Sequence, residues 1–227
     1  KLGWTDTLLL ERKRLTSGTT WHAAGLVGQL RATANLTKLA QYTTNLYASL
    51  EAETGQATGF MQRGSVSLAT TPGRMEELLR GASMAMTFGL EVHRVTPSEI
   101  KSHWPLLNVD DVIGGVFLPK DGQTNPIDTT MALVKGATQR GVKVRENVEV
   151  TRILVKNGRA VGVETKDGEI QAEHVVIASG MWSRHLGITA GVDIPLQANE
   201  HFYIVTEPFP GLAPTLPVLR DQDNCAY

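Results

Sequence analysis

Helical and strand patterns of apolar residues alternate along the chain. From residue 35 to residue 55 the apolar side chains recur at helical spacing, which predicts an amphipathic helix with Asn35 as its N-cap and Gly55 as its stop. The apolar positions of that helix are Leu36, Leu39, Ala40, Leu46, Tyr47 and Leu50. The alternating stretch GFMQRGSVSLATTP predicts a strand, and the Thr71-Pro72 pair at its end predicts the start of a second helix. This order of elements is typical of a mixed α/β fold.

Capping residues mark two further helices. Thr96 and Glu99 form the pattern of a capping box at the start of TPSEIKSHWPLL. Asn125 and Pro126 open another helix, which we expect to end at Gly141. A strand, VIGGVFLP, lies between these two helices in the sequence. The helices are therefore expected to pack on the faces of a sheet.

Several β-rich runs follow from residue 142 onward. They are separated by Asn157-Gly158 and Asp167-Gly168, the preferred two-residue hairpin turns, and together they predict a β-meander. The next run, EHVVIASG, has the composition of a buried parallel strand whose small final residues let a ligand approach the backbone. A further long strand is expected at IPLQANEHFYIVTE.

Candidate chemistry is concentrated near the start of the chain, in LLLERKRLTSGTTWHAAGL. An apolar strand there ends at Glu11 and runs into a Ser/Thr/Gly loop that contains His22, as in one half of a nucleotide-binding unit. From the pattern alone, Glu11 could equally be a solvated carboxylate beside Arg12, and His22 a core imidazole bonded to a carbonyl. No serine nucleophile elbow or Walker loop is present, which leaves hydrolase and phosphoryl-transfer functions without support.

Composition narrows the classes of partner. The chain has 227 residues, 41% of them hydrophobic and 20% charged, and a formal net charge of -1, so nothing indicates a nucleic-acid partner. No apolar run approaches the ~18 residues of a membrane-spanning helix, so no membrane insertion is expected. The single cysteine, Cys225, cannot form an internal disulfide and favours a reducing compartment. No metal site is expected, because no carboxylate or thiol stands at ligand spacing from the remaining histidines, His93, His103, His174 and His185.

Five stretches, taken in order, carry a family resemblance: LLLERKRLTSGTTWHAAGL, LPKDGQTNP, VVIASGMWS, ANEHFYIVTE and PVLRDQDNCAY. They resemble the sarcosine and dimethylglycine dehydrogenases, flavoproteins of the D-amino-acid-oxidase-like superfamily, over essentially the whole chain. The resemblance implies a Rossmann-type FAD-binding domain with a β-meander, interleaved with a substrate domain that contains an antiparallel or mixed sheet. It assigns residues 1–60 and 126–190 to the FAD-binding domain, and residues 61–125 and 191–227 to the substrate domain.

The resemblance also implies roles for individual residues. Glu11 would accept hydrogen bonds from the adenosine ribose, and His22 would bond covalently to the 8α-methyl carbon of the flavin. The other cofactor-binding positions are Arg12, Ser17, Gly18, Thr19, Ala23, Gly25, Leu26, Val148, Ser179, Gly180 and Trp182. His201 and Tyr227 match the catalytic pair, which would remove the proton from the substrate amine.

The implied reaction is the oxidative demethylation of sarcosine or dimethylglycine. A hydride leaves the N-methyl carbon for flavin N5, and the resulting iminium gives formaldehyde or a one-carbon unit bound to tetrahydrofolate. Electrons would then pass to an electron-transfer flavoprotein or to dioxygen. Two alternatives stay open: a non-catalytic relative, such as the regulatory subunit of pyruvate dehydrogenase phosphatase, and a noncovalent flavin oxidase of another amine or amino acid.

One motif expected of this fold is missing. The chain contains no G-x-G-x-x-G turn to hold the pyrophosphate of FAD, so we expect it to be a fragment that by itself neither binds FAD tightly nor turns over substrate. Any tetrahydrofolate-binding region would lie in a missing C-terminal part. The family resemblance favours the cytoplasm of a bacterium, or alternatively the mitochondrial matrix.

Overall fold

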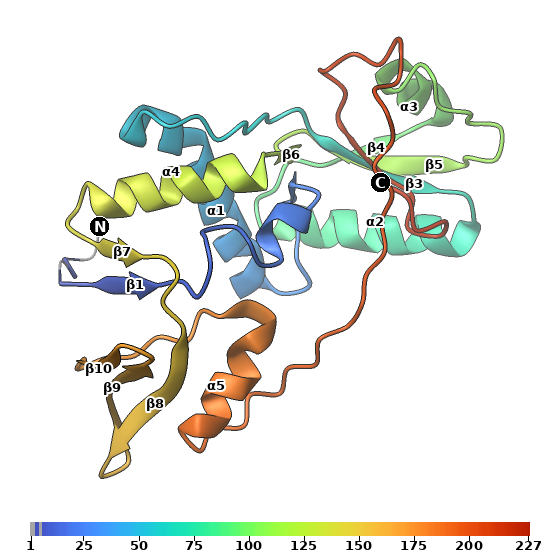
Figure 1. Ribbon diagram of the computed structural model, residues 1–227. Coiled ribbons are helices and arrows are strands. Elements are labelled where there is room, and N and C mark those ends of the chain that lie inside the picture. The colour runs from blue at the N-terminus through green and yellow to red at the C-terminus, as the bar shows by residue number, and fades with distance from the viewer. Residues whose placement is uncertain (1–2, 5) are drawn as a thin grey trace. The chain divides into compact units, whose positions relative to one another are not determined.

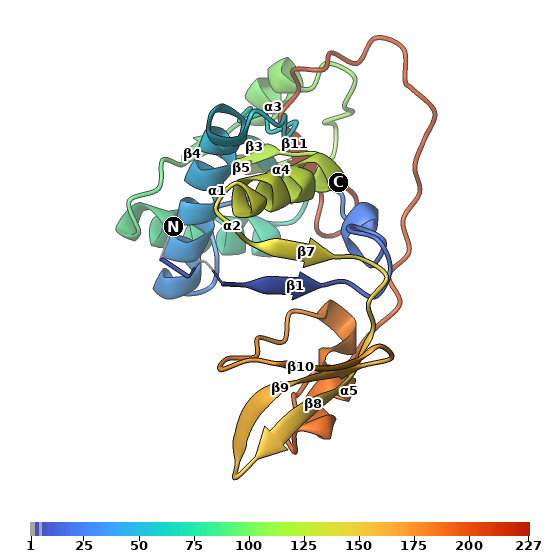
Figure 2. The same ribbon diagram turned by 60° about the vertical axis from the view of Figure 1, so that its left-hand side comes forward.

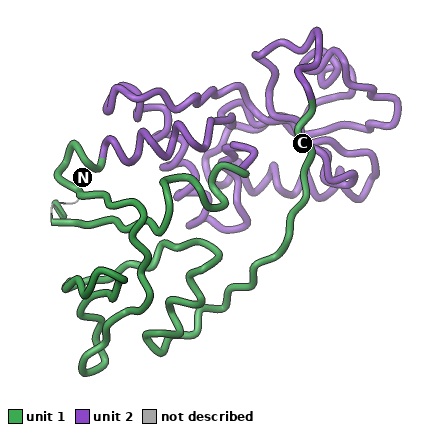
Figure 3. Tube along the Cα trace, viewed as in Figure 1, with its two compact units in different colours: residues 1–22, 137–206 green, residues 23–136, 207–227 purple. Residues whose placement is uncertain are grey.

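In the computed structural model, which describes residues 3–4 and 6–227, the chain divides into two compact units (Figure 3). Unit 1 comprises residues 1–22 and 137–206, and unit 2 comprises residues 23–136 and 207–227. These units are defined by packing alone. The functional assignment of residues 1–60 and 126–190 to a FAD-binding domain therefore stays a prediction.

Unit 1 contains a short parallel pair of strands and a three-stranded meander (Figure 2). Its elements are β1 (Leu8–Leu10), η1 (Thr20–His22), β7 (Lys143–Arg145), β8 (Val150–Lys156), β9 (Arg159–Thr165), β10 (Gly168–Gln171), η2 (Gly180–Trp182) and α5 (Ser183–Thr189). β1 pairs with β7, although more than 130 residues separate Leu8 from its partner Lys143. Helix α5 packs on β8.

The meander forms where the turn residues predict it. Asn157 and Gly158 occupy the two loop positions between β8 and β9 with φ of 51° and 74°, as a type I′ turn requires. The second turn lies one residue earlier than expected. Gly168 already pairs with Thr165, so Lys166 and Asp167 form the loop between β9 and β10.

Two predicted strands are wrong. Neither residues 174–179, within EHVVIASG, nor residues 194–207, which are IPLQANEHFYIVTE, are in a strand. A strand requires a ladder of backbone hydrogen bonds to a neighbouring strand, and no strand of the described chain pairs with either stretch. Their apolar composition alone therefore does not produce a sheet.

Unit 2 is built around a four-stranded sheet of order β11-β3-β5-β4, with α2 and α3 packed on it (Figure 1). Its elements are β2 (Leu26–Val27), α1 (Ala34–Thr54), β3 (Ser65–Ala69), α2 (Pro72–Thr87), β4 (His93–Val95), α3 (Pro97–His103), β5 (Gly114–Leu118), β6 (Gly122–Gln123), α4 (Pro126–Thr138, which runs into unit 1) and β11 (Val218–Arg220). β5 pairs antiparallel with β3 and β4, and β11 runs parallel to β3. The mixed sheet and the surrounding helices confirm the predicted α/β class.

Two apolar clusters form the core of unit 2, one on each face of the sheet. The first consists of Val66, Leu68, Val95, Ile100 and Val112, and it includes the α3 side chain Ile100. The second consists of Ala82, Ala85, Leu90, Val116 and Leu118, and it includes two alanines of α2. Alternation along β3 places its two serines, Ser65 and Ser67, on the α2 face, opposite Val66 and Leu68. Polar groups therefore line the sheet on the α2 side.

The helix boundaries follow the sequence signals with two corrections. Helix α4 ends at Thr138, three residues before the predicted stop at Gly141. Helix α1 ends at Gly55 as predicted, with φ of 66°, but its N-cap is Thr33, whose hydroxyl accepts from Leu36 N, and not Asn35. The capping box of α3 is confirmed. The Thr96 backbone N–H and hydroxyl both donate to Glu99, and these bonds lower the pKa of the Glu99 carboxyl.

Helix α1 buries threonines where leucines were expected. Its buried residues are Thr37, Thr44, Leu50 and Thr54. By contrast, Leu36 and Leu39 are 51% and 60% exposed. Periodicity thus predicts the helix correctly but not which of its faces is covered. Among the described residues, no helix combines the length and apolar character needed to cross a bilayer.

Candidate functional site

Glu11 lies directly after β1, at the carboxyl end of the parallel pair. Its backbone continues the ladder, since its N–H donates to Arg145 O at 2.9 Å and its carbonyl accepts from Val148 N at 2.9 Å. One carboxylate oxygen accepts from Lys13 N at 2.8 Å. The other has no hydrogen-bond partner in the part of the chain that the structure describes, so it can accept from a ligand hydroxyl. Two predicted cofactor residues, Glu11 and Val148, are therefore neighbours.

Arg12, Gly18 and Trp182 form a second group of predicted residues. The Arg12 guanidinium carbon lies 4.1 Å from the centre of the Trp182 ring, a cation–π contact. A Cβ atom on Gly18 would lie 3.4 Å from the same indole, so the loop backbone packs close to it. Ser179 accepts from Trp182 N at 3.1 Å and, with Gly180 at φ 55°, forms the bend that leads into η2. The indole thus connects the Glu11 loop to the segment that precedes α5.

His22 ends the short helix η1. Its N–H donates to Thr19 O at 3.2 Å, and the Trp21 ring lies against its imidazole with centroids 3.7 Å apart. His22 Nδ1 lies 2.8 Å from Tyr203 Oη. Ser17, the remaining predicted residue of this loop, is exposed, and its N–H donates to Arg14 O at 3.1 Å.

Gly25 and Leu26 belong to unit 2 and are positioned by the β2–β6 pair. Gly25 has φ of 77°, and its carbonyl accepts from Thr124 N at 2.8 Å. A Cβ atom at Gly25 would overlap Thr124 O, so only glycine fits this approach of two backbone segments. Ala23, two residues earlier, is exposed.

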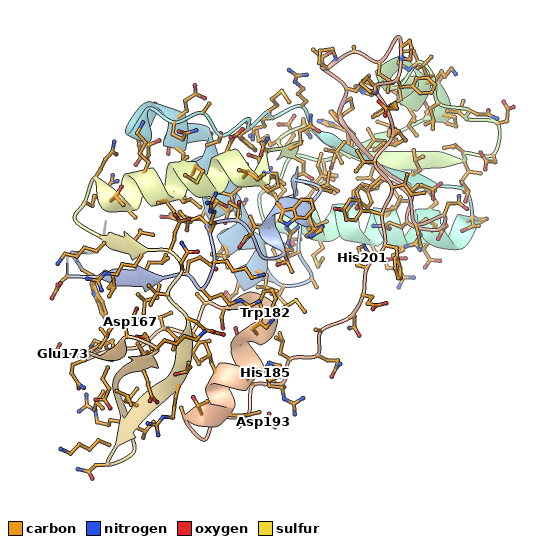
Figure 4. The ribbon with its side chains drawn as sticks, viewed as in Figure 1. Asp167, Glu173, Trp182, His185, Asp193 and His201 are labelled. Carbon is orange, nitrogen blue, oxygen red and sulfur yellow. The ribbon has the colours of Figure 1, made fainter. Side chains whose placement is uncertain are left out.

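The two predicted catalytic residues lie on exposed parts of the chain. His201 is on the extended segment after α5 and belongs to unit 1 (Figure 4). Tyr227 belongs to unit 2 and is 59% exposed. It follows a tight turn closed by Asp221 and Ala226, in which Cys225 is exposed with φ of 53°. The pairing of His201 with Tyr227 stays a prediction.

A buried carboxylate that the sequence did not reveal lies in unit 2. Asp121, only 4% exposed, accepts from Gln29 N at 2.9 Å and from Ser65 Oγ at 2.7 Å. Burial raises the pKa of its carboxyl, and the two hydrogen bonds, with nearby Arg31, oppose that rise. The side chain lines an open cavity of about 600 Å³ between β3, β5 and α2. In the sequence it is only one polar residue of the turn PKDG.

Tyr203 and Trp21 are the other contacts that the sequence did not reveal. Trp21 is next to His22, but aromatic neighbours are common and carry no specific signal. Tyr203 lies 181 residues away from His22, and no spacing pattern connects the two. Among the described residues, no group of three or more His, Cys, Asp or Glu side chains forms a metal-binding cluster.

The family model described as "DAO: FAD dependent oxidoreductase" matches residues 1–227. The chain belongs to this family. It is 43% identical over 99% of its length to 4-methylaminobutanoate oxidase (formaldehyde-forming) of Paenarthrobacter nicotinovorans, and 42% identical over 100% to mitochondrial sarcosine dehydrogenase of Homo sapiens. It is also 36% identical over its whole length to the mitochondrial regulatory subunit of pyruvate dehydrogenase phosphatase of Mus musculus.

These comparisons confirm the resemblance and the fold class. The chain spans about a quarter of each curated relative, covering 27%, 25% and 26% of their lengths. The crystal structure of L-proline dehydrogenase from P. horikoshii superposes with a TM-score of 0.77 at 26% identity, over 82% of this chain and 49% of that one. The chain is therefore placed in the family of FAD-dependent oxidoreductases, with the mixed α/β fold of its structural relatives.

Proposed function

We propose that this chain forms part of an enzyme that oxidises the N-methyl group of a small amino acid, sarcosine or dimethylglycine, with FAD. The observation that carries the proposal is the match to the relatives named for sarcosine and for 4-methylaminobutanoate, which share an N-methyl amine and a carboxylate. When bound, the flavin supplies the acceptor for a hydride from the methyl carbon. Water then hydrolyses the resulting iminium to formaldehyde and the demethylated amine, unless tetrahydrofolate captures the one-carbon unit.

The residues present fit part of the cofactor. The second carboxylate oxygen of Glu11 would bind the ribose hydroxyls, and the loop from Ser17 to Leu26 would lie along the flavin. His22 Nε2 has no hydrogen-bond partner among the described residues, so it would be the atom that bonds the 8α-methyl carbon. The pyrophosphate has no comparable partner in this sequence, because no G-x-G-x-x-G turn is present. These 227 residues would therefore hold the cofactor only together with further protein.

His201 and Tyr227 would prepare the substrate. An ammonium group has no lone pair, so hydride loss requires the neutral amine. The imidazole of His201 would accept that proton, and the phenol of Tyr227 would donate or accept a hydrogen bond. The electrons would then pass to an electron-transfer flavoprotein or to dioxygen, in the bacterial cytoplasm or the mitochondrial matrix.

The test uses the protein that carries this chain, purified with its cofactor. After acid denaturation and removal of small molecules, we expect flavin absorbance to stay with the protein and the mass of FAD to appear on the peptide that contains His22. The His22→Ala variant should release its flavin. His185→Ala, on the exposed surface of α5, is the matched control and should retain it (Figure 4).

Two other results would point to other functions. Flavin that is bound but fully released by acid would indicate a noncovalent oxidase. A protein with no flavin at all would indicate a regulatory protein, a candidate favoured by the 36% identity to the phosphatase subunit. If the flavin is retained, the rates of turnover of sarcosine and of dimethylglycine would show which of the two is the substrate.

A further inference from the structure

The His22 imidazole is fixed on two sides within unit 1. The Trp21 ring lies against its face, with centroids 3.7 Å apart and planes inclined by 35°. Tyr203 approaches its edge, with the phenol oxygen 2.8 Å from Nδ1 and the two rings at 72°. The ring therefore cannot rotate without breaking the hydrogen bond at Nδ1. Among the described residues nothing bonds Nε2, so this nitrogen is available to another partner.

Tyr203 is less exposed to solvent than the residues beside it in the segment 202–205. Its neighbours Phe202, Ile204 and Val205 are 87%, 91% and 82% exposed, whereas Tyr203 is 43% exposed. This part of the chain has no strand partner among the described residues, so no ladder of backbone hydrogen bonds positions it. The contact with His22 is the hydrogen bond that the structure gives the Tyr203 side chain.

A hydrogen bond at Nδ1 selects between the two neutral tautomers of an imidazole. If the phenol donates to Nδ1, the ring proton lies on Nε2 and blocks its lone pair. If Nδ1–H donates to the phenol oxygen, the lone pair is on Nε2. Only the second arrangement can form a bond from Nε2, and a partner at one ring nitrogen commonly fixes the chemistry of the other.

We propose that Tyr203 is a positioning residue for the covalent attachment of FAD: its phenol oxygen accepts the Nδ1 proton of His22 and keeps the Nε2 lone pair available. This role rests on the proposed function. Forming the bond from Nε2 to the methyl carbon would release one proton from that carbon and the proton on Nδ1. The flavin would supply the path by which the two electrons reach dioxygen, which would become hydrogen peroxide. Tyr203 Oη lies 2.8 Å from Nδ1 and therefore next to the proton on that nitrogen. The Tyr203 side chain is 43% exposed, so it can pass this proton to water.

The first experiment measures the tautomer without any cofactor chemistry. Nitrogen-15 chemical shifts of His22 are recorded in the cofactor-free protein for the wild type, Tyr203→Phe and Tyr42→Phe. Tyr42 is 60% exposed on α1 and serves as a matched control, because its variant loses the same hydroxyl from a side chain of the other unit. We expect the proton on Nδ1 in the wild type and in Tyr42→Phe, and a loss of this preference in Tyr203→Phe.

The second experiment measures attachment. Cofactor-free protein is mixed with FAD in air, and the flavin that survives acid denaturation is followed over time. A neutral hydrogen bond of about 1 kcal/mol corresponds to about a fivefold change in rate, so Tyr203→Phe should attach flavin about fivefold to tenfold more slowly than Tyr42→Phe. His22 Nε2 should be the linked atom in all three proteins.

The possible results distinguish failure of the positioning role of Tyr203 from failure of the proposed covalent FAD. Unchanged His22 shifts in Tyr203→Phe, or equal attachment rates in the two variants, would overturn the role of Tyr203. A wild-type protein that never retains flavin after acid treatment, while His22 still carries its proton on Nδ1, would instead overturn the covalent cofactor of the proposed function.

Discussion

The hydrogen bonds of the buried Asp121 carboxylate in unit 2 can be tested by a single substitution. Its carboxylate joins the loop at Gln29 to the first residue of β3, Ser65, across 92 and 56 residues of sequence. The substitution Asp121→Ala removes both acceptors while leaving the backbone bond from Gly64 N to Asp121 O in place. The substitution therefore removes these two side-chain hydrogen bonds and the carboxylate charge near Arg31.

The expected loss follows from the two donors. A buried N–H without a partner costs about 1–3 kcal/mol, and the Gln29 N–H cannot rotate to another acceptor. The Ser65 hydroxyl can rotate, so its contribution is smaller, on the order of 1 kcal/mol. Relief of the cost of burying the Asp121 charge reduces this sum to its lower end. We expect Asp121→Ala to lower the free energy of local opening by about 2 kcal/mol.

Native-state hydrogen exchange measures this opening directly. A change of about 2 kcal/mol corresponds to exchange about 30-fold faster in the peptides that contain Gln29 and Ser65. Asp111→Ala, an exposed aspartate of the same unit, is the control and should leave exchange unchanged. If Asp121→Ala exchanged as slowly as the control, the two hydrogen bonds would not hold this loop, and the reasoning would be refuted.

The raised pKa of Asp121 adds a dependence on pH whose sign can be stated. Between the ordinary carboxyl pKa of 3.8 and the higher folded value, the folded protein binds more protons than the unfolded chain. The contribution of Asp121 to stability is thus fully present below pH 3.8 and falls as the pH rises through the folded pKa. Asp121→Asn can still accept from Gln29 N and can donate to Ser65, so it should stay folded and lose this pH dependence. If the stability measured by urea unfolding changed with pH in the same way in Asp121→Asn and in the wild type, the assignment of this pH dependence to Asp121 would be wrong.

Three further substitutions test other parts of the structure. Gly25→Ala, which forces a Cβ into Thr124 O, should separate β2 from β6 and cost about 3 kcal/mol or more, seen as loss of exchange protection there. Thr96→Ala removes the cap of α3 and should cost about 1 kcal/mol in urea unfolding; equal midpoints would argue against the cap. Arg12→Ala should cost about 0.5–1 kcal/mol in unit 1 and change the fluorescence of Trp182, whereas an unchanged spectrum would show that the ring contact is absent in solution.

Local chemistry explains which elements could be predicted. The Asn157-Gly158 turn, the capping box at Thr96 and the stop at Gly55 each depend on a few adjacent residues, and all three are confirmed. The N-cap at Thr33 was missed because two residues with capping side chains, Thr33 and Asn35, stand close together. A strand depends on a partner far away in the sequence, which explains why the apolar run EHVVIASG was wrongly predicted to be one.

In the candidate site, too, residues in local sequence patterns could be predicted, whereas residues defined by distant contacts could not. Glu11 could be found because it ends a short apolar strand, and His22 because its loop carries a recognisable motif. Asp121 could not be found, since its burial depends on Gln29 and Ser65. Tyr203 was equally hidden, because no local pattern relates a phenol to an imidazole 181 residues earlier. Long-range polar contacts of this kind follow from the tertiary structure alone.

The turn at the end of unit 2 has a practical consequence for spectroscopy. Cys225 is the single cysteine of this chain, and it is exposed two residues before Tyr227. The segment is anchored by the ion pair between Arg74 and Asp223, at 2.6 Å. A maleimide dye or a nitroxide label would therefore attach to this chain at one defined place without an engineered thiol. Its signal would report on the surroundings of Tyr227 when an amine substrate is added.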